Sequence, residues 1–514
     1  MSLPFQSTKG FKGFSELTNG LKKEDGKIQL NYNSNHFESD SNGQLQSRLD
    51  YIIGDGLTYN SGTDKIETVG ETSVEDYNTV GDGITNDGQA FQNAIDAVSG
   101  GDVQKTLKLS SGKTYSIGQK LVINKSNVRI EGNGAKLIND GSIESMFEIQ
   151  GELENLSFEN FTIEATDIGG TSLQQGVIAN FDNHPLTNIY FDRVNVHTNQ
   201  GSGITFESDD GQNETGTITN FSFTNCTVES DDSSQYGLSL RKHANQVFIN
   251  NNRFIMNHSS SYNNLALYAG AENFEVSNNY FFGGGHSPLA CSPARYGSIT
   301  GNILEYGSGS QASDEGGIEI EWKNSHRSLE TSHDITCTGN VVRGYHWGIF
   351  VVRRDTDDIR PYNITITGNV VEDASNRGIL IDALRDVSVT NNIVYNAGFK
   401  NIDVWSCENI TITGNICKNS SNPDSSIIDI TQTSAGTADP LTDKANVSNN
   451  TIQGWRGDRR AIRINSSDGN TVANAIITGN IMDDDGSGGD FIVIDGDDSG
   501  VQIIQANNME IVRD

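Results

Sequence analysis

The chain has 514 residues and carries 67 acidic against 35 basic residues, which gives a net charge of −32. This balance excludes a polyanionic nucleic acid as a partner, because binding one requires a basic surface that releases counterions. Hydrophobic residues make up only 34% of the chain, and 55 Gly with 7 Pro favour many short strands and tight turns over a helical bundle.

The sequence also disfavours a membrane protein, a disulfide-rich or zinc-binding protein, and an exported protein. No apolar run approaches the roughly 18 residues of a membrane span, so we expect no membrane insertion. The five Cys are odd in number and lack zinc-ligand spacing, so neither a disulfide framework nor a zinc site is expected. The N-terminal MSLPFQSTKGFKGF lacks the apolar core of a signal peptide, which predicts a protein made in the cytoplasm without export.

Residues 1–70 contain no copy of the repeat that fills the rest of the chain. Their blocks IQLNYNSNHFESDSNGQL and LDYIIGDGLTYNSGTDKI resemble repeats common in the stalks of viral tail fibres. The resemblance implies a small region for virion attachment or trimerisation, which would contact other virion tail or baseplate proteins. A disordered leader is the alternative interpretation.

Residues 71–140 are predicted to form the cap helix and first coil of a solenoid. The segment VGDGITNDGQAFQNAIDAVSGG combines a Gly-rich turn, a capping residue at Asn86 or Asp87, and a helix. One face of this helix is apolar and consists of Ala90, Phe91, Ala94, Ile95 and Val98. Such a helix can close the open end of a stack of strands.

The same segment carries a family resemblance. Gly81 to Ala97 resembles the GDGxTDDTxAFQxAIDAA motif of the pectate-lyase-like superfamily, which includes many viral tailspikes. The resemblance implies an all-β fold, a right-handed parallel β-helix, and for tailspikes a homotrimer. It is weak for chemistry, because this superfamily includes lyases, hydrolases, epimerases and pure binders.

Residues 141–514 repeat one unit, at spacings of about 23 to 38 residues in its clearest copies. One strand of the unit ends in TGN or a variant, as in ITCTGN at Asn340 and VSVTNN at Asn392. A second strand has a GIxI signature, as in GIEI from Gly317 and GILI from Gly378. A unit of this size cannot bury its apolar face alone, so stacked units are predicted to form a parallel β-helix that binds glycan.

Two recurring residue types are assigned to the fold. A ladder of side-chain amides at one turn is predicted for Asn340, Asn369, Asn392 and Asn415. Cys337 stands in ITCTGN where the next copy, ITITGN, has Ile366, so its thiol is predicted to lie in the core.

Alignment of the GIxI strands predicts two outward columns, in which residues distant in sequence lie one rung apart. The first column is predicted to contain Thr205, Ser239, Ala266, Glu319, Phe350, Leu380, Asp403, Asp429, Arg463 and Val493. The second is predicted to contain Glu207, Arg241, Tyr268, Glu321, Val352, Asp382, Trp405, Thr431, Asn465 and Asp495. Acidic and aromatic residues concentrate between Glu319 and Asp429, which makes this stretch the candidate site.

Two pairs of carboxylates in this stretch are candidates for glycoside hydrolysis. Glu319 and Glu321 alternate with Ile in GGIEIEWKN, so both point outward and lie roughly 6.6 to 6.8 Å apart along the strand. The two carboxyl groups of an inverting hydrolase are about 6.5 to 9.5 Å apart. Asp382 with Asp403 on an adjacent rung is the second pair. The alternative is that all four are solvated acids, as expected on any protein this acidic.

Aromatic and basic residues around these acids predict a carbohydrate-binding groove. All four Trp of the chain lie in this region. Apolar faces of sugars stack on such rings, and carboxylates accept hydrogen bonds from sugar hydroxyls. The predicted binding residues are Trp322, His346, Trp347, Arg353, Arg354, Trp405 and Asp429.

Other chemistries have less support. A lyase or epimerase needs a base near a uronate carboxylate, which the basic residues of the groove could supply. However, the calcium cluster and arginine motif of pectate lyases are missing, as are the aspartate and histidine motifs of polygalacturonases and alginate epimerases. No cofactor is predicted. Acidic loops at Asp209, Asp355 and Asp483 are weak candidates for Ca²⁺, with solvated turns as the favoured interpretation.

The sequence therefore predicts a virion tailspike or receptor-binding fibre that recognises a host surface polysaccharide or glycoprotein glycan. A polysaccharide-degrading enzyme, a glycoside hydrolase before a lyase, is one alternative, and a purely structural fibre is another. The missing export signal agrees with assembly in the host cytoplasm and location in the virion tail. The acidic surface suits high salt, since at about 1 M the Debye length is about 3 Å. Solubility of an elongated protein explains that surface equally well.

Overall fold

A computed structural model describes residues 71–512 with gaps, together with four short strands nearer the N-terminus. The gaps are residues 142, 166–175, 200, 209–215, 232–235, 258–262, 308–315, 323–330, 355–358, 423–424, 433–443, 455–459, 467–473, 485–490 and 496–501. The chain divides into two compact units, Met1–Glu71 and Thr72–Asp514.

The described part of the N-terminal unit consists of two antiparallel hairpins. One pairs β1 (Leu21–Glu24) with β2 (Lys27–Leu30), and the other pairs β3 (Leu57–Asn60) with β4 (Lys65–Thr68). The rest of the predicted attachment region, residues 1–70, lies outside the described residues.

The second unit begins with a cap. β5 (Glu71–Ser73), the 3-10 helix η1 (Val74–Tyr77) and β6 (Asp82–Asn86) precede helix α3 (Gly88–Val98). Of the predicted apolar face, Phe91, Ala94, Ile95 and Val98 are buried, and the Phe91 ring lies 6.4 Å from the ring of Phe147 in the first coils. The predicted cap helix is confirmed. No helix in the described part of the chain is long and apolar enough to cross a membrane.

The start of α3 uses both predicted capping residues, in different ways. Asn86 Oδ1 accepts a hydrogen bond from the Gly88 backbone N–H at 2.9 Å, so it satisfies an orphan donor of the first turn. The Asp87 carboxylate instead accepts the backbone N–H groups of Val80 at 2.6 Å and Gly81 at 3.1 Å. These contacts fix the preceding Gly-rich turn against the helix.

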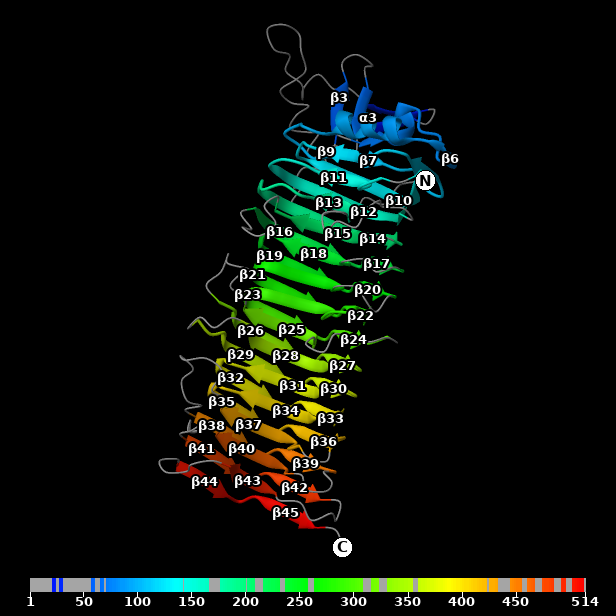
Figure 1. The fold of residues 1–514 in the computed structure, drawn as a ribbon. Coiled ribbons are helices and arrows are strands. Elements are labelled where there is room, and N and C mark those ends of the chain that lie inside the picture. The colour runs from blue at the N-terminus through cyan, green and yellow to red at the C-terminus, as the bar shows by residue number, and fades with distance from the viewer. Residues whose placement is uncertain are drawn as a thin grey trace, which may run out of the picture. The chain divides into compact units, whose positions relative to one another are not determined.

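From β7 onward the chain forms a right-handed parallel β-helix, as predicted (Figure 1). Its strands fall into three parallel stacks, named sheets 1, 2 and 3, and long strands bend from one sheet to the next. Each coil contributes one rung to each sheet. From β15 downward, sheet 1 runs down the middle of Figure 1, with sheet 2 at its left and sheet 3 at its right.

Sheet 1 carries the GIxI strands. It contains β9 (Leu121–Ile123), β11 (Phe147–Ile149), β13 (Gly176–Asn180), β15 (Ser202–Glu207), β18 (Leu238–Arg241), the first halves of β21 (Leu265–Ser277) and β23 (Leu289–Thr300), β25 (Gly316–Trp322), β28 (Trp347–Arg353), β31 (Arg377–Asp382), β34 (Lys400–Trp405), β37 (Ile428–Gln432), β40 (Ile462–Ser466) and β43 (Ile492–Asp495).

Sheet 2 carries the strands that end in TGN. It contains β7 (Lys105–Lys108), the first parts of β10 (Val128–Asn139), β12 (Leu153–Ala165) and β14 (Leu186–Thr198), β16 (Thr217–Thr224), β19 (His243–Asn250), the second halves of β21 and β23, β26 (His333–Thr338), β29 (Tyr362–Thr367), β32 (Arg385–Thr390), β35 (Glu408–Thr413), β38 (Lys444–Ser448), β41 (Asn474–Thr478) and β44 (Gln502–Ala506).

Sheet 3 follows the TGN turn. It contains β8 (Thr114–Ile117), the second parts of β10, β12 and β14, β17 (Thr227–Ser230), β20 (Arg253–Met256), β22 (Tyr280–Gly283), β24 (Ile303–Glu305), β27 (Val341–Arg343), β30 (Val370–Glu372), β33 (Ile393–Ala397), β36 (Ile416–Ser420), β39 (Thr451–Gln453), β42 (Ile481–Asp484) and β45 (Met509–Val512).

The interior is one continuous apolar core, aromatic toward the N-terminus and aliphatic toward the C-terminus. Stacked Phe rings fill the N-terminal coils, with centroids 4.9 Å apart for Phe158 and Phe191 and 5.1 Å apart for Phe254 and Phe281. All five Cys are buried. Burial raises the pKa of Cys337 to about 12, so this thiol is an inert core group, as predicted.

The backbone of the TGN turn between sheets 2 and 3 requires the residues that recur there. The residue before each ladder Asn has a left-handed backbone, as at Gly368 (φ 65°) and Asn391 (φ 55°), a conformation that Gly and Asn tolerate best. The following Asn, which is buried on every coil but the last, donates its Nδ2 to the Oδ1 of the next Asn at 2.9 to 3.0 Å. This ladder runs through Asn252, Asn279, Asn302, Asn340, Asn369, Asn392, Asn415, Asn450, Asn480 and Asn508. The predicted amide ladder is confirmed.

The Gly of the GIxI signature is explained by close packing. A Cβ at Gly348 would lie 2.2 Å from Val371 Cγ1 and 2.5 Å from the Gly378 carbonyl oxygen. Sheets 1 and 3 therefore approach closely at this corner, and any larger side chain would force the rungs apart.

Candidate functional site

The two outward columns of sheet 1 have the predicted order, with one coil added. Thr205 pairs in register with Ser239, and the same column continues through Glu319, Phe350, Leu380, Asp403 and Asp429 to Arg463. The expectation that Ala266 and Tyr268 directly precede Glu319 and Glu321 is wrong. A rung formed by β23 lies between them and places Ala290 and Ser292 in the two columns.

The glutamate pair on β25 lies at one end of the site. Glu319 and Glu321 share a single guanidinium: Arg354 Nη2 lies 2.7 Å from Glu319 Oε1, and Arg354 Nε lies 3.0 Å from Glu321 Oε2. The Ser287 hydroxyl donates to Glu319 Oε2 at 2.5 Å. Both side chains point outward as predicted, but the two residues as a whole are only 3% and 7% exposed, so the solvated-acid alternative is wrong for this pair.

An apolar strip follows on the next two rungs. Phe350 and Val352 of β28 and Leu380 of β31 are buried and form a small cluster of their own, against which Trp347 and Trp405 pack while partly exposed. The Trp347 ring lies 4.3 Å from that of Phe350. The Arg354 guanidinium lies 5.1 Å from the Phe350 ring and joins the strip to the glutamate pair.

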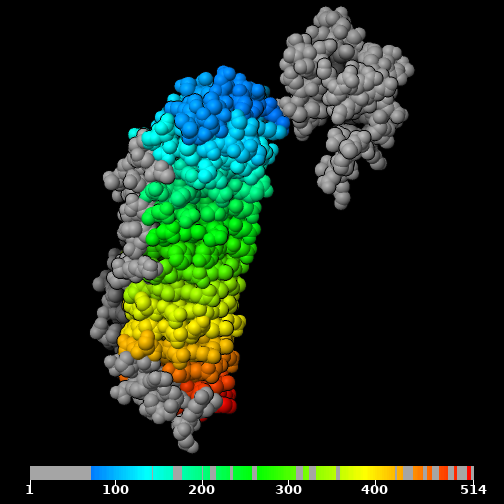
Figure 2. All heavy atoms as spheres, turned by 90° about the vertical axis from the view of Figure 1, so that its right-hand side faces the viewer, coloured from blue at the N-terminus to red at the C-terminus, as the bar shows by residue number. Residues whose placement is uncertain are grey.

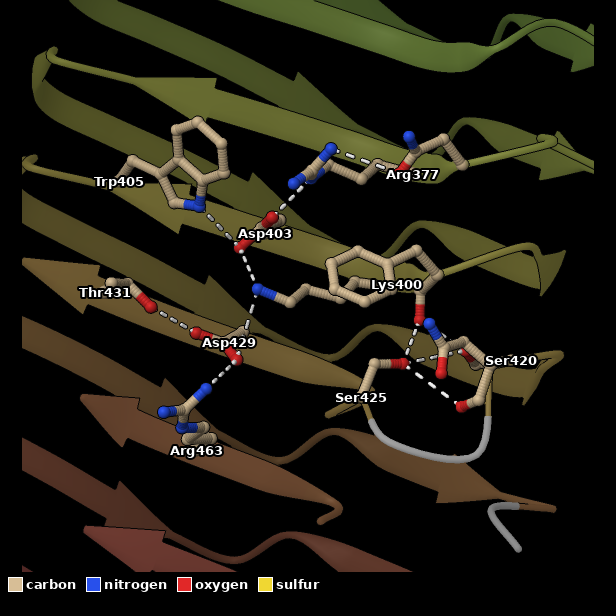
Figure 3. A network of polar contacts seen from close by, with 12 residues as sticks. Arg377, Lys400, Asp403, Trp405, Ser420, Ser425, Asp429, Thr431 and Arg463 are labelled. Carbon is tan, nitrogen blue, oxygen red and sulfur yellow. Dashed lines mark hydrogen bonds and ion pairs between the residues drawn. The ribbon is translucent and has the colours of Figure 1, made fainter. Parts of the chain in front are cut away.

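A second charged cluster lies beyond the strip, on β31 to β40 (Figure 3). Asp403 Oδ2 accepts a hydrogen bond from Arg377 Nε at 2.5 Å, and Asp403 Oδ1 accepts one from Lys400 Nζ at 3.0 Å. Lys400 Nζ also lies 3.3 Å from Asp429 Oδ2, which Arg463 Nη1 approaches to 3.7 Å. Three cations therefore surround two fully buried carboxylates. We name these five residues the aspartate network.

Trp405 is fixed to this network. Its Nε1 donates to Asp403 Oδ1 at 3.0 Å, and the Arg377 guanidinium lies 4.8 Å from its ring. Burial raises the pKa of Asp403, Lys400 lowers it, and the neighbouring Asp429 carboxylate raises it, so the net direction is upward. The ring of Trp405 is thus held in one orientation by a buried carboxylate behind it.

The remaining predicted residues surround this arrangement. Asp382 is partly exposed and in register with Trp405, so it lies diagonally from Asp403 on the adjacent rung. His346 is partly exposed, with its ring 5.4 Å from that of Trp347. Trp322 and Arg353 are buried and in register at the ends of β25 and β28. The predicted set therefore lies together on sheet 1, from β25 to β37.

Sequence reasoning placed Arg463 in the outward column but not in the candidate site, and it missed two further members of the aspartate network. Arg377 and Lys400 begin their strands and are in register with each other and with Trp347. Each lies three residues before an outward column position, so an alignment extended upstream of the GIxI signature would have found this third row. Their neighbour Phe399 also contacts both cations, at 5.2 Å from Arg377 and 5.1 Å from Lys400.

The site contains no recognisable metal centre among the residues that the structure describes. These include no group of three or more His, Cys, Asp or Glu that could hold a metal ion. Of the weak calcium candidates, Asp209 and Asp355 lie outside the described residues, and Asp483 is buried on β42.

Comparison with known proteins agrees with the fold. Residues 304–509 match a family described as periplasmic copper-binding protein (NosD). Comparison with curated protein sequences finds no match. Among solved structures, the chain is similar to PfbA, a surface adhesin of Streptococcus pneumoniae, at 17% identity and a TM-score of 0.50, over 68% of this chain and 92% of that one.

Two further solved structures are similar to the chain with lower TM-scores. One is the catalytic unit of an α-1,3-glucanase from Streptomyces thermodiastaticus, at 17% identity and a TM-score of 0.48, over 83% of this chain and 70% of that one. The other is tailspike protein 3 of bacteriophage CBA120, at 12% identity and a TM-score of 0.43, over 94% and 70%. At these identities the likeness is one of fold, a right-handed parallel β-helix found in tailspikes, glycan-degrading enzymes and adhesins.

Proposed function

We propose that the chain is a receptor-binding protein of the tailspike type, which recognises a host surface glycan through the outward face of sheet 1. The observation that supports this most directly is the pair of partly exposed rings, Trp347 and Trp405, held over an apolar strip between two ion-paired clusters. Rings present apolar surface to sugar faces, and the flanking charged groups supply hydrogen bonds to hydroxyls.

The rigidity of this surface favours binding. Trp405 is fixed by its hydrogen bond to Asp403 and by Arg377, and Trp347 is packed on Phe350. A ligand that meets side chains already held in place loses less free energy to ordering than one that must immobilise them. The buried carboxylates of the site thus act through the residues that they position.

Hydrolysis is the second candidate, and one observation favours it. Burial raises the pKa of Asp403, which is the direction that a general acid requires. Against it, Glu319 and Glu321 are both ion-paired with the Arg354 guanidinium and are only 3% and 7% exposed, which leaves little of either carboxyl group accessible to a substrate. A glycoside hydrolase is therefore proposed only as the alternative, with Asp382 and Asp403 as its pair.

The virion role rests on the sequence. Residues 1–70 resemble the stalks of tail fibres, and the tailspike resemblance implies a homotrimer attached to a virion tail and assembled in the host cytoplasm. Copper is not proposed as a ligand, although the family matched by residues 304–509 is described as copper-binding. Cys337, Cys407 and Cys417 in that segment are buried, and the described residues contain no group that could hold a metal.

Glycan binding is tested with the full chain on an array of cell-envelope glycans, in both low salt and about 1 M NaCl. We expect saturable binding that Trp347→Ala or Trp405→Ala weakens at least tenfold, because each removes a ring that contacts sugar. Phe248→Ala is the matched control, since Phe248 is an exposed ring on sheet 2, 39% exposed. A blank array at both salt concentrations, or equal losses in all three variants, would refute the proposal.

Incubation with the same glycans distinguishes a glycan-binding protein from a glycan-degrading enzyme. Mass spectrometry of the supernatant after incubation detects any released oligosaccharide, and the gain of one water identifies hydrolysis. Fragments that disappear in Asp382→Asn and Asp403→Asn, with Glu319→Gln unaffected, would establish the alternative. Intact glycan that co-elutes with the protein supports receptor binding.

A further inference from the structure

The outward surface of sheet 3 carries a continuous line of apolar side chains. Successive rungs place Tyr280, Ile303, Val341, Val370, Ile393, Ile416, Thr451, Ile481 and Met509 in one column, each in register with the next. We name this column the apolar stripe. Ile303, Ile393, Ile481 and Met509 are 40%, 38%, 39% and 57% exposed, and the others are partly buried. Figure 2 views the molecule from the side on which sheet 3 lies in Figure 1.

This stripe is not explained by folding. Alternation on a strand directs these residues away from the core, where a chain with 20% charged residues normally places polar groups. Single exposed apolar residues need no explanation, but contiguous ones mark an interaction surface. Nine rungs at about 4.8 Å give a stripe roughly 38 Å long without one charged side chain.

The neighbouring outward column of sheet 3 is nearly neutral. It contains Glu305, Arg343, Glu372, Tyr395, Lys418, Gln453 and Asp483, which is three acids against two bases. Arg343 bridges its neighbours, with Nη1 2.9 Å from Glu305 Oε1 and Nε 2.8 Å from Glu372 Oε2. Two copies of a chain with a net charge of −32 repel each other, and a column whose charges nearly balance adds little to that repulsion.

We infer that the apolar stripe is the surface by which the chain binds a second copy of itself, with the two solenoid axes aligned. An occupant must present apolar groups at the same repeat of about 4.8 Å over roughly 38 Å, and the stripe of another copy does so rung for rung. The contact therefore joins sheet 3 to sheet 3. It leaves the glycan-binding face on sheet 1 open.

The area predicts the strength of this contact. Strands three to five residues wide over nine rungs give roughly 400 to 600 Å² per copy. A standard interface takes about 800 Å² from each partner. Self-association through the stripe alone is therefore expected to be weak and reversible.

Analytical ultracentrifugation of the full chain tests the contact. We expect Ile393→Glu to raise the dissociation constant at least tenfold, because it places two like charges in the middle of the interface. Ile476→Glu is the matched control, since Ile476 is 45% exposed on β41 of sheet 2. A monomer at every concentration up to about 100 μM, or equal effects of the two substitutions, would overturn the inference. Circular dichroism verifies that both variants remain folded.

Cross-linking locates the partner. All five native Cys are buried, so the thiol of an Ile303→Cys or Ile481→Cys variant reacts selectively with a short bis-maleimide. Copies that run in the same direction give 303–303 and 481–481 products, and copies that run in opposite directions give 303–481 products from a mixture of the two variants. Either pattern supports the contact, and the absence of both at an associating concentration contradicts it.

The inference and the proposed function fail separately. Ile393→Glu is expected to leave glycan affinity per chain unchanged, because it lies on sheet 3, and Trp347→Ala is expected to leave self-association unchanged. A stripe variant that remains associated overturns only the inference, and a blank glycan array overturns only the proposed glycan binding, whereas a native chain that is monomeric at every concentration also contradicts the proposed homotrimer.

Discussion

The outward surfaces of sheets 1 and 3 invert the usual relation between polarity and exposure. On sheet 1, Glu319, Asp403 and Asp429 point away from the core and are nevertheless buried. On sheet 3, Ile303 and Ile393 occupy equivalent outward positions and are exposed. Alternation along a strand therefore sets the direction of a side chain, but the groups that lie over the strand decide whether it meets water.

The largest expected difference in folding stability is between variants of two arginines, each of which bridges two glutamates. Arg354 joins Glu319 and Glu321, whose side chains are 4% and 9% exposed, whereas Arg343 joins Glu305 and Glu372, whose side chains are 34% and 16% exposed. We expect Arg354→Met to cost about 3 to 5 kcal/mol, because two buried carboxylates lose the guanidinium that bridges them. Arg343→Met is expected to cost under about 1 kcal/mol.

Denaturant midpoints of the two variants measure this difference. Methionine keeps the apolar part of each arginine side chain, so the comparison isolates the loss of charge. Equal losses of stability in the two variants would show that the burial of the glutamate pair has no energetic consequence.

A buried lysine beside sheet 1 gives a smaller, pH-dependent effect. Lys242 is fully buried after β18, its Nζ donates to the His184 carbonyl at 3.2 Å, and Asp182 Oδ1 lies 3.5 Å away. Burial lowers the pKa of Lys242 to about 8 despite the raising effect of Asp182. Below pH 8 the folded chain buries the charged ammonium group, which lowers its stability. In the unfolded chain this Lys has a pKa of about 10.4, so as the pH rises above 8 the folded chain loses its proton first and the destabilisation decreases.

Lys242→Met should therefore stabilise the folded state, relative to the native chain, more at pH 7 than at pH 10. Thermal unfolding of both proteins across that range tests the sign. A stability difference that is constant with pH would contradict the lowered pKa, and Lys136→Met on an exposed ion pair is the control expected to show no such trend.

The smallest expected effect is that of salt. The cost of Arg343→Met should fall toward zero in about 1 M NaCl, where the Debye length is about 3 Å, while that of Arg354→Met should persist because its partners are shielded from solvent. The measurement repeats the denaturant midpoints in high salt. A cost of Arg354→Met that also vanishes would mean that the glutamate pair is accessible to ions.

Much of the fold could be predicted because the repeat encodes it directly. The Gly or Asn before each ladder Asn, as at Gly368 and Asn391, is required by a left-handed backbone, and Asn392 is required by the buried amide ladder. These demands recur on every coil and therefore survive the variation in loop length. The order of the two outward columns on sheet 1 follows from the same periodicity.

The parts that could not be predicted depend on contacts without a repeating pattern. The sheet 1 half of β23, LACSP, lacks the GIxI signature, so its rung was missed. Arg377 and Lys400 lie upstream of that signature, and only the register brings them to Asp403. The burial of Glu319 was also missed, because alternation specifies direction and not what covers a side chain.

The amide ladder also gives the solenoid a mechanical character. Its hydrogen bonds, like those between rungs, join one coil to the next and therefore lie along the axis. A force that pulls the two ends apart stretches the hydrogen bonds of the terminal coil first. The coils should therefore detach one after another from the ends. Each released coil of about 23 to 38 residues lengthens the chain by roughly 80 to 130 Å. Under tension, the unit of failure would be the single coil.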